Sequence, residues 1–136
     1  MPTLPWTAAA TPPPADLSEV VVLASRLELR QLRTVPAFLR AAMAVRRQML
    51  SAPGALGVSL IAMPFSRTFW TLSAWTSSEA LDAAVRDATH VEVMRSFSPR
   101  LRASQFVTWT VAPSALPISW SDALARLERA SWDAAA

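Results

Sequence analysis

Residues 66–90, SRTFWTLSAWTSSEALDAAVRDATH, combine a strand pattern, a helix start and the single histidine of the chain. Between residues 67 and 75, aromatic and β-branched residues alternate in a way that is typical of a strand buried on both faces. The polar residues that follow predict a helix with Thr76 as its N-cap and Glu79 completing a capping box. The apolar stripe of this helix comprises Ala80, Leu81, Ala84, Val85 and Ala88. A strand is therefore expected to run directly into a helix.

The segments before this stretch predict a strand, a helix and a second strand. Residues 19–29, EVVVLASRLEL, alternate as a strand, with Leu23, Ser25 and Leu27 on one face. Residues 35–51 carry apolar side chains at helical spacing after Thr34, a suitable N-cap. The turn residues Ala52-Pro53-Gly54 then lead into an apolar strand over residues 55–63. Its short connection to residues 67–75 predicts antiparallel pairing.

The segments after the stretch complete the pattern. A second helical piece is expected over residues 90–101, and a last strand over residues 104–111, SQFVTWTV. The resulting order, βαββαβ, predicts an α+β fold of the ferredoxin-like sandwich type, with both helices on one face of an antiparallel sheet. Because the strands are apolar on both faces, we expect a homodimer in which the second face packs on another copy.

The two ends of the chain are expected to lie outside this domain. Residues 1–18 are rich in proline and predict an extended arm rather than packed structure. Residues 19–111 form the predicted ferredoxin-like domain. Residues 112–136 predict a linker followed by an amphipathic helix over residues 119–132, which could clamp the partner subunit.

Composition excludes several classes of function. At 136 residues the chain predicts one domain, and no apolar run approaches the roughly 20 residues of a membrane helix. The absence of cysteine and of a signal-peptide pattern favours a cytoplasmic location. All 13 basic residues are arginines scattered among acids, which argues against a nucleic-acid surface. With two glycines and no lysine, the chain has neither a phosphate-binding glycine motif nor an amine for Schiff-base chemistry.

Two residues are candidates for catalysis, His90 and Arg67. His90 is the only side chain with an ordinary pKa near neutrality, so it could act as a general base or as an axial haem ligand. The alternative is a capping or surface histidine. No metal-binding motif accompanies it, so a zinc site is not expected. Arg67 could stabilise an anion if it faces inward, and would be an ordinary surface charge if it faces outward.

Aromatic and methionine residues predict a pocket between the sheet and the helices. Alternation places Trp70 on one face of its strand and Trp75 on the other, so the tryptophans cannot all line one pocket. The alternative is that they fill the core and a subunit interface. The candidate substrate-binding residues are Phe38, Met43, Trp70, Trp75, Met94 and Trp109.

The sequence RTFWTLSAWTSSEALDAAVRDATHVEVM resembles the strand, tryptophan, Ser-Glu-Ala-Leu helix and terminal histidine of the antibiotic-biosynthesis-monooxygenase-like, dimeric α+β barrel superfamily. The resemblance covers residues 20–111 and is greatest to the branch related to spheroidene monooxygenase. It implies a monooxygenase-type tailoring enzyme of small-molecule biosynthesis, acting on an aromatic or polyene-like substrate without a cofactor. His90 would be the base or polar anchor and Arg67 the anion-stabilising group.

Two alternatives to this enzyme remain. One is a haem-binding protein or haem-dependent monooxygenase with His90 as axial ligand. The resemblance counts against haem degradation, because the haem-degrading members pair a histidine with an asparagine and this chain has no asparagine. The other is a ligand-binding or structural dimer without catalytic activity, since one fold hosts many functions.

Overall fold

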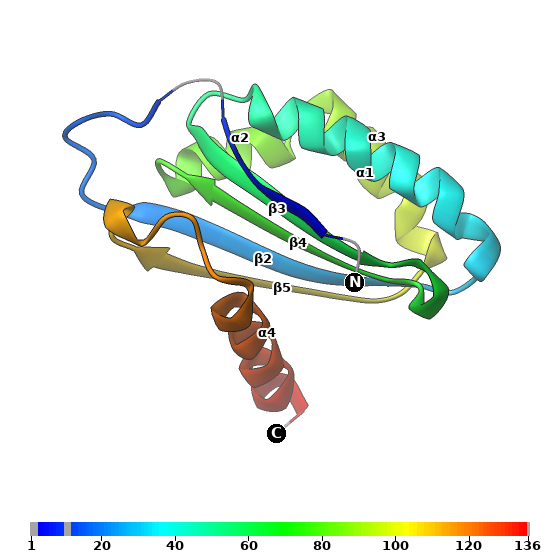
Figure 1. The fold of residues 1–136 in the computed structure, drawn as a ribbon. Helices are drawn as coiled ribbons and strands as arrows, with labels where there is room; N and C mark the ends of the chain where they lie inside the picture. Colours follow the sequence, from blue (N-terminus) through cyan, green and yellow to red (C-terminus); the bar gives the residue numbers. More distant parts are fainter. Residues whose placement is uncertain (1–2, 10–11, 136) are drawn as a thin grey trace.

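The computed structural model describes residues 3–9 and 12–135, with side chains described as far as residue 130. Within these residues a single antiparallel sheet has the strand order β1-β3-β4-β2-β5 (Figure 1). The strands are β1 Thr3–Ala8, β2 Val20–Leu29, β3 Ala55–Met63, β4 Thr68–Trp75 and β5 Leu101–Val111. The predicted ferredoxin-like α+β fold is confirmed, with one additional strand at the edge of the sheet.

Three helices cover one face of the sheet, called here the inner face (Figure 1). They are α1 Val35–Leu50, α2 Ser78–Val85 and α3 Ala88–Phe97. Inward-facing apolar residues of β2, β3 and β4 pack against them in two clusters, one around Phe69 and one around Trp75, both of which are fully buried. The alternation along residues 67–75 is thus confirmed, since Phe69 and Trp75 share this inner face.

The start of α2 differs from the predicted one by one residue. Its N-cap is Ser77, whose hydroxyl accepts a hydrogen bond from the backbone N–H of Ala80 at 3.1 Å. Thr76 was predicted as the cap, but its backbone N–H donates to the carbonyl oxygen of Gly54. Thr76 therefore still belongs to the strand side of the junction, and the helix begins one residue later.

The segment after α2 also differs from its predicted bounds. A new helix, α3, begins at Ala88 with Asp87 as its N-cap, and the chain then makes a 3-10 turn over Ser98–Arg100. The predicted helix over residues 90–101 is thus shorter and begins earlier, and β5 begins at Leu101 rather than at residue 104. His90 consequently lies in the first turn of a helix.

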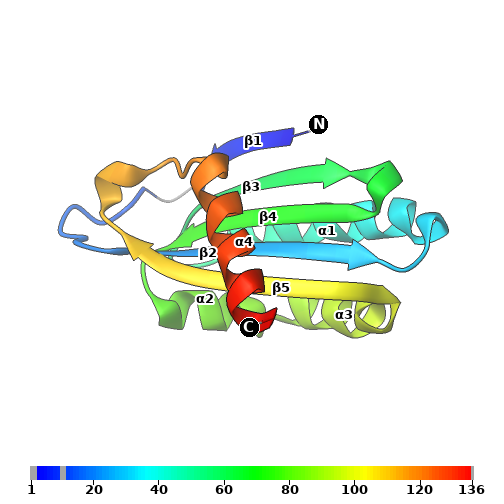
Figure 2. The same ribbon diagram turned by 90° about the horizontal axis from the view of Figure 1, so that it is seen from below.

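The two ends of the chain pack onto the sheet. Residues Thr3–Ala8, which were expected to be an unpacked arm, form the edge strand β1 and pair antiparallel with β3. Helix α4, Trp120–Ala135, lies across the opposite face of the sheet, called here the outer face (Figure 2). There Ala123 and Leu127 pack against Val22 and Leu72. The chain itself thus covers much of the face on which a second copy was expected.

No helix in the described part of the chain is long and apolar enough to cross a membrane.

Candidate functional site

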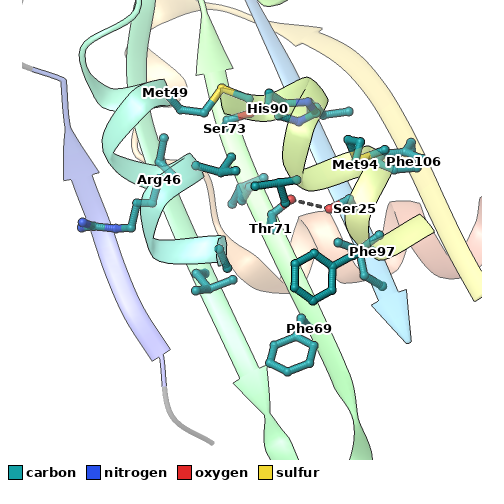
Figure 3. Close-up of a pocket in the computed structure, with 18 of the residues that line it drawn as sticks. Ser25, Arg46, Met49, Phe69, Thr71, Ser73, His90, Met94, Phe97 and Phe106 are labelled. Atoms are coloured by element: carbon teal, nitrogen blue, oxygen red, sulfur yellow. Dashed lines mark hydrogen bonds between the residues drawn. The ribbon is translucent and has the colours of Figure 1, made fainter. Parts of the chain in front are cut away.

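A cavity of about 140 Å³ lies between the inner face of the sheet and helices α1 and α3 (Figure 3). Its floor is formed by residues of β2, β3 and β4, and its roof by side chains of the two helices. The walls are mainly apolar, and the cavity is comparable in volume to an engineered cavity of about 150 Å³ that binds benzene in another protein. A single aromatic ring therefore fits this space.

Three phenylalanines close one end of the cavity. The ring centroids of Phe38 and Phe69 are 4.7 Å apart, and those of Phe38 and Phe97 are 5.3 Å apart with nearly perpendicular planes. Tilted and edge-to-face contacts of this kind are favourable aromatic geometries. Because all three rings are buried, this end of the cavity is a fixed apolar wall.

Hydroxyl groups lie on the floor of the cavity. Ser25 in β2 and Thr71 in β4 are directly paired across the two strands, and their hydroxyls share a hydrogen bond. Two residues further along β4, the hydroxyl of Ser73 accepts a hydrogen bond from the indole Nε1–H of Trp75 at 2.9 Å. The floor therefore carries three hydroxyl groups in a cavity that is otherwise mainly apolar.

His90 is the one histidine that can reach this cavity, and it lines the roof from the first turn of α3. Burial lowers its pKa below the usual value of 6.5, although the nearby backbone of Val85 and the negative charge of Asp87 act in the opposite direction. Its Nδ1 atom is buried and has no hydrogen-bond partner among the described residues. At neutral pH the imidazole is thus neutral and can accept a proton.

Arg46 also lines the cavity, from α1. Its guanidinium donates a hydrogen bond from Nη2 to the hydroxyl of Thr7 in β1 at 2.8 Å, while its Nε is buried without a partner in the part of the chain that is described. The strand β1 therefore holds the guanidinium at the edge of the sheet, and Figure 3 shows this end of the side chain pointing away from the other cavity residues. Arg46 could not be identified from the sequence pattern, because its contact with Thr7 depends on a strand that the proline-rich composition did not predict.

The cavity opens to solvent between α3 and β5. Met94 of α3 and Phe106 of β5 both line the cavity, and they are 39% and 51% exposed. Figure 3 shows the two side chains next to each other at one side of the cavity. Since β5 is an edge strand, this side of the cavity has no further strand beside it.

The structure brings together three of the candidate residues, His90, Phe38 and Met94, on the walls of this cavity. Met43, Trp75 and Arg67 do not line it. Trp75 lies in the inner core against Met49 and Leu81, and Arg67 lies in the turn before β4 with a left-handed φ of 56°.

Trp70 and Trp109 lie on the outer face of the sheet, where they pack against the cluster covered by α4. The guanidinium carbon of Arg126 is 4.7 Å from the centroid of the Trp109 ring. These two tryptophans thus contribute to the attachment of α4, in agreement with the alternative that the tryptophans fill the core.

Ser25, Thr71 and Ser73 line the cavity but were not among the candidate residues. The signal for them is present in the sequence, because strand alternation places Ser25 with Leu23 and Leu27, and Thr71 with Phe69. Small hydroxyl residues on the buried side of a strand indicate a polar requirement at that position.

The cavity does not fit haem. Ligands of drug size occupy pockets of about 300–1,000 Å³, and a porphyrin belongs to this range or above it. The present cavity is well below that range. Within residues 3–9 and 12–135, no three His, Cys, Asp or Glu side chains gather into a potential metal site.

The chain matches no protein-family model and no curated protein, but it shares its fold with solved structures. A Nitrosomonas europaea protein, provisionally assigned as an antibiotic biosynthesis monooxygenase, is 12% identical, with a TM-score of 0.64 over 75% of this chain and 96% of that one. The structure of a mutant of SnoaB, a cofactor-independent oxygenase from Streptomyces nogalater, is 14% identical to this chain in sequence. Its TM-score is 0.59, over 72% of this chain and 97% of SnoaB. A protein of Pseudomonas aeruginosa is 16% identical, with a TM-score of 0.63 over 70% of this chain and 96% of that one. These similarities establish the fold of antibiotic biosynthesis monooxygenases.

Proposed function

We propose that this protein is an oxygenase that acts on a small aromatic substrate without a cofactor, as a tailoring enzyme of natural-product biosynthesis. The observation that carries the proposal is a ring-sized cavity with one neutral, half-buried histidine on its wall. The shared fold with SnoaB, which is described as a cofactor-independent oxygenase, supports the same reaction class.

The chemistry requires few groups from the protein. A hydroxylated aromatic ring is electron-rich once it loses its hydroxyl proton, and the resulting anion can itself reduce molecular oxygen. His90 would take that proton, since its lowered pKa keeps the imidazole in the basic form at neutral pH. The apolar walls would exclude water from the anion. The sequence candidate Arg67 does not line the cavity, and the guanidinium of Arg46 is bonded to Thr7 of β1, so neither arginine is assigned to the negative charge.

We also propose a cytoplasmic homodimer, as expected from the sequence. Helix α4 covers much of the outer face, so a second copy would bind elsewhere or displace α4. The free edge of β5, where the cavity opens, is one surface that remains available for such a contact.

Oxygen uptake tests the proposed reaction. The purified chain, with no added cofactor, is incubated with a dihydroxybenzene, and oxygen consumption is measured with an electrode. His90→Ala should lower the rate by about 10²-fold or more, the usual effect of losing a general base. Glu92→Gln is the matched control, because Glu92 is exposed on the same helix and does not line the cavity.

The outcomes discriminate between the functional classes. A rate that is unchanged in His90→Ala removes this residue from the mechanism. If no ring compound is consumed but such compounds still bind, the chain is a ligand-binding protein and the oxygenase proposal is wrong.

A further inference from the structure

We propose that Ser25 and Thr71 form an oxygen-binding subsite on the floor of the cavity, which selects a single-ring substrate bearing a hydroxyl or carbonyl oxygen over the corresponding hydrocarbon. This inference rests on the proposed function only in requiring that a small ring enters the cavity. Neither residue takes part in the proton transfer assigned to His90.

The position of the pair follows from the register of the sheet. Ser25 and Thr71 are Cα partners in the antiparallel pairing of β2 and β4, and both side chains point to the inner face. Ser25 is only 3% exposed. Figure 3 shows the pair in the middle of the cavity residues, with His90 on one side and the rings of Phe69 and Phe97 on the other.

The hydrogen bonds of the pair leave one donor unused. Each hydroxyl has one proton to donate, and a bond between two hydroxyls uses only one of the two protons. No other hydrogen bond of either side chain is found within the described residues. A buried donor without an acceptor is unfavourable, so the pair is suited to receive an acceptor from outside the chain.

An oxygen atom on the ligand meets this requirement. A hydroxyl or carbonyl oxygen has lone pairs to accept the unused proton, whereas a methyl group in the same place would leave it unpaired. Sites built to hydrogen-bond a substrate oxygen discriminate strongly against analogues that lack it, because their own polar groups are then left without partners. The volume of about 140 Å³ limits the rest of the ligand to one ring.

Phenol and toluene are the probes that test the subsite, since they differ mainly by a hydroxyl in place of a methyl group. The dissociation constants of both are measured by calorimetry or NMR titration for the full chain and for the double variant Ser25→Ala, Thr71→Val. We expect the ratio of toluene to phenol dissociation constants to fall roughly tenfold in the double variant. The variant Thr71→Ser, which keeps the hydroxyl, should retain the preference of the wild type.

A matched control is Ser104→Ala with Thr110→Val. It makes the same two changes on exposed positions of β5, and it should leave both dissociation constants unchanged. The wild-type chain supplies a second readout that does not depend on the folding of the double variant. The methyl resonance of Thr71 should shift more with phenol than with toluene.

The results separate this inference from the proposed function. If both rings bind and the ratio is unchanged in the double variant, or the Thr71 methyl shifts equally with both probes, the subsite is overturned while the proposed function stands. If neither ring binds to the wild-type chain, the subsite and the proposed function are both wrong.

Discussion

Trp120 of α4 donates its indole Nε1–H to the hydroxyl of Ser59 in β3 across 2.9 Å. The same hydroxyl donates to the carbonyl oxygen of Leu4 in β1 across 2.8 Å. A single buried serine therefore connects the C-terminal helix and the N-terminal strand to the middle of the sheet. These contacts join positions 61 and 55 residues apart in the sequence.

Replacing Trp120 by phenylalanine should destabilise the protein by about 1–2 kcal/mol. The aromatic packing on the outer face is mostly kept, but Ser59 loses its donor and some ring volume is lost. Urea unfolding followed by circular dichroism measures the change in the free energy of unfolding. Arg129→Gln, at an exposed position of the same helix, is the control and should change it by less than about 0.5 kcal/mol. Equal stabilities of Trp120→Phe and wild type would show that α4 is not held by this contact.

Removing residues 112–136 should increase self-association. The deletion uncovers Val22, Leu72 and Trp109 on the outer face, and an exposed apolar sheet face favours packing against another copy. Light scattering at micromolar concentration gives the number of copies for the full and the shortened chain. We expect the shortened chain to form assemblies with more copies than those of the full chain. The same number of copies in both would show that α4 does not shield an interface. A mass of 14.8 kDa for the full chain in solution, which is the mass of one copy, would contradict the homodimer.

The central elements of the fold were predictable because their signals are local. Strand alternation over residues 67–75 and the proline and glycine after α1 depend on neighbouring residues alone, and the structure confirms the strand β3 at its predicted bounds. The edge strand β1 was missed because prolines usually argue against a strand. Pro5 is tolerated there since an edge strand has one side without sheet hydrogen bonds.

The close approach of β1 explains why residue 57 is glycine. A Cβ atom built on Gly57 would lie 2.3–2.5 Å from atoms of the Trp6 indole, which is far closer than a real contact. Gly57→Ala should therefore displace Trp6 and cost about 1–3 kcal/mol, as expected for overpacking. Chemical denaturation measures the effect.

A double-mutant cycle checks the cause of that effect. In a Trp6→Ala background the clash is absent, so Gly57→Ala should have a much smaller effect there. Additive changes in the free energy of unfolding would show that the cost at Gly57 arises from something other than Trp6.

The candidate site was predicted only in part, because a cavity depends on contacts between distant segments. His90, Phe38 and Met94 were identified by residue type and helical position, and all three line the cavity. Ser25 and Thr71 are 46 residues apart, and their hydroxyls meet only through the register of β2 and β4. Local patterns gave the face on which each lies, but the pairing requires the assembled sheet.

The pKa of His90 predicts how stability depends on pH. Burial lowers this pKa in the folded chain, so between the folded pKa and the usual value of 6.5 the unfolded chain binds the proton more readily. The free energy of unfolding therefore falls as pH decreases below about 6.5, and levels off below the folded pKa. His90→Gln has no imidazole to bind this proton. The stability of the wild type relative to the variant should therefore decrease as the pH is lowered from 7 to 5. Denaturant unfolding of both proteins across this range measures the difference, from which titrations common to both cancel. A relative stability that stays constant would contradict the lowered pKa. One that increases toward low pH would mean a raised pKa, and would also contradict the neutral imidazole that the proposed base requires.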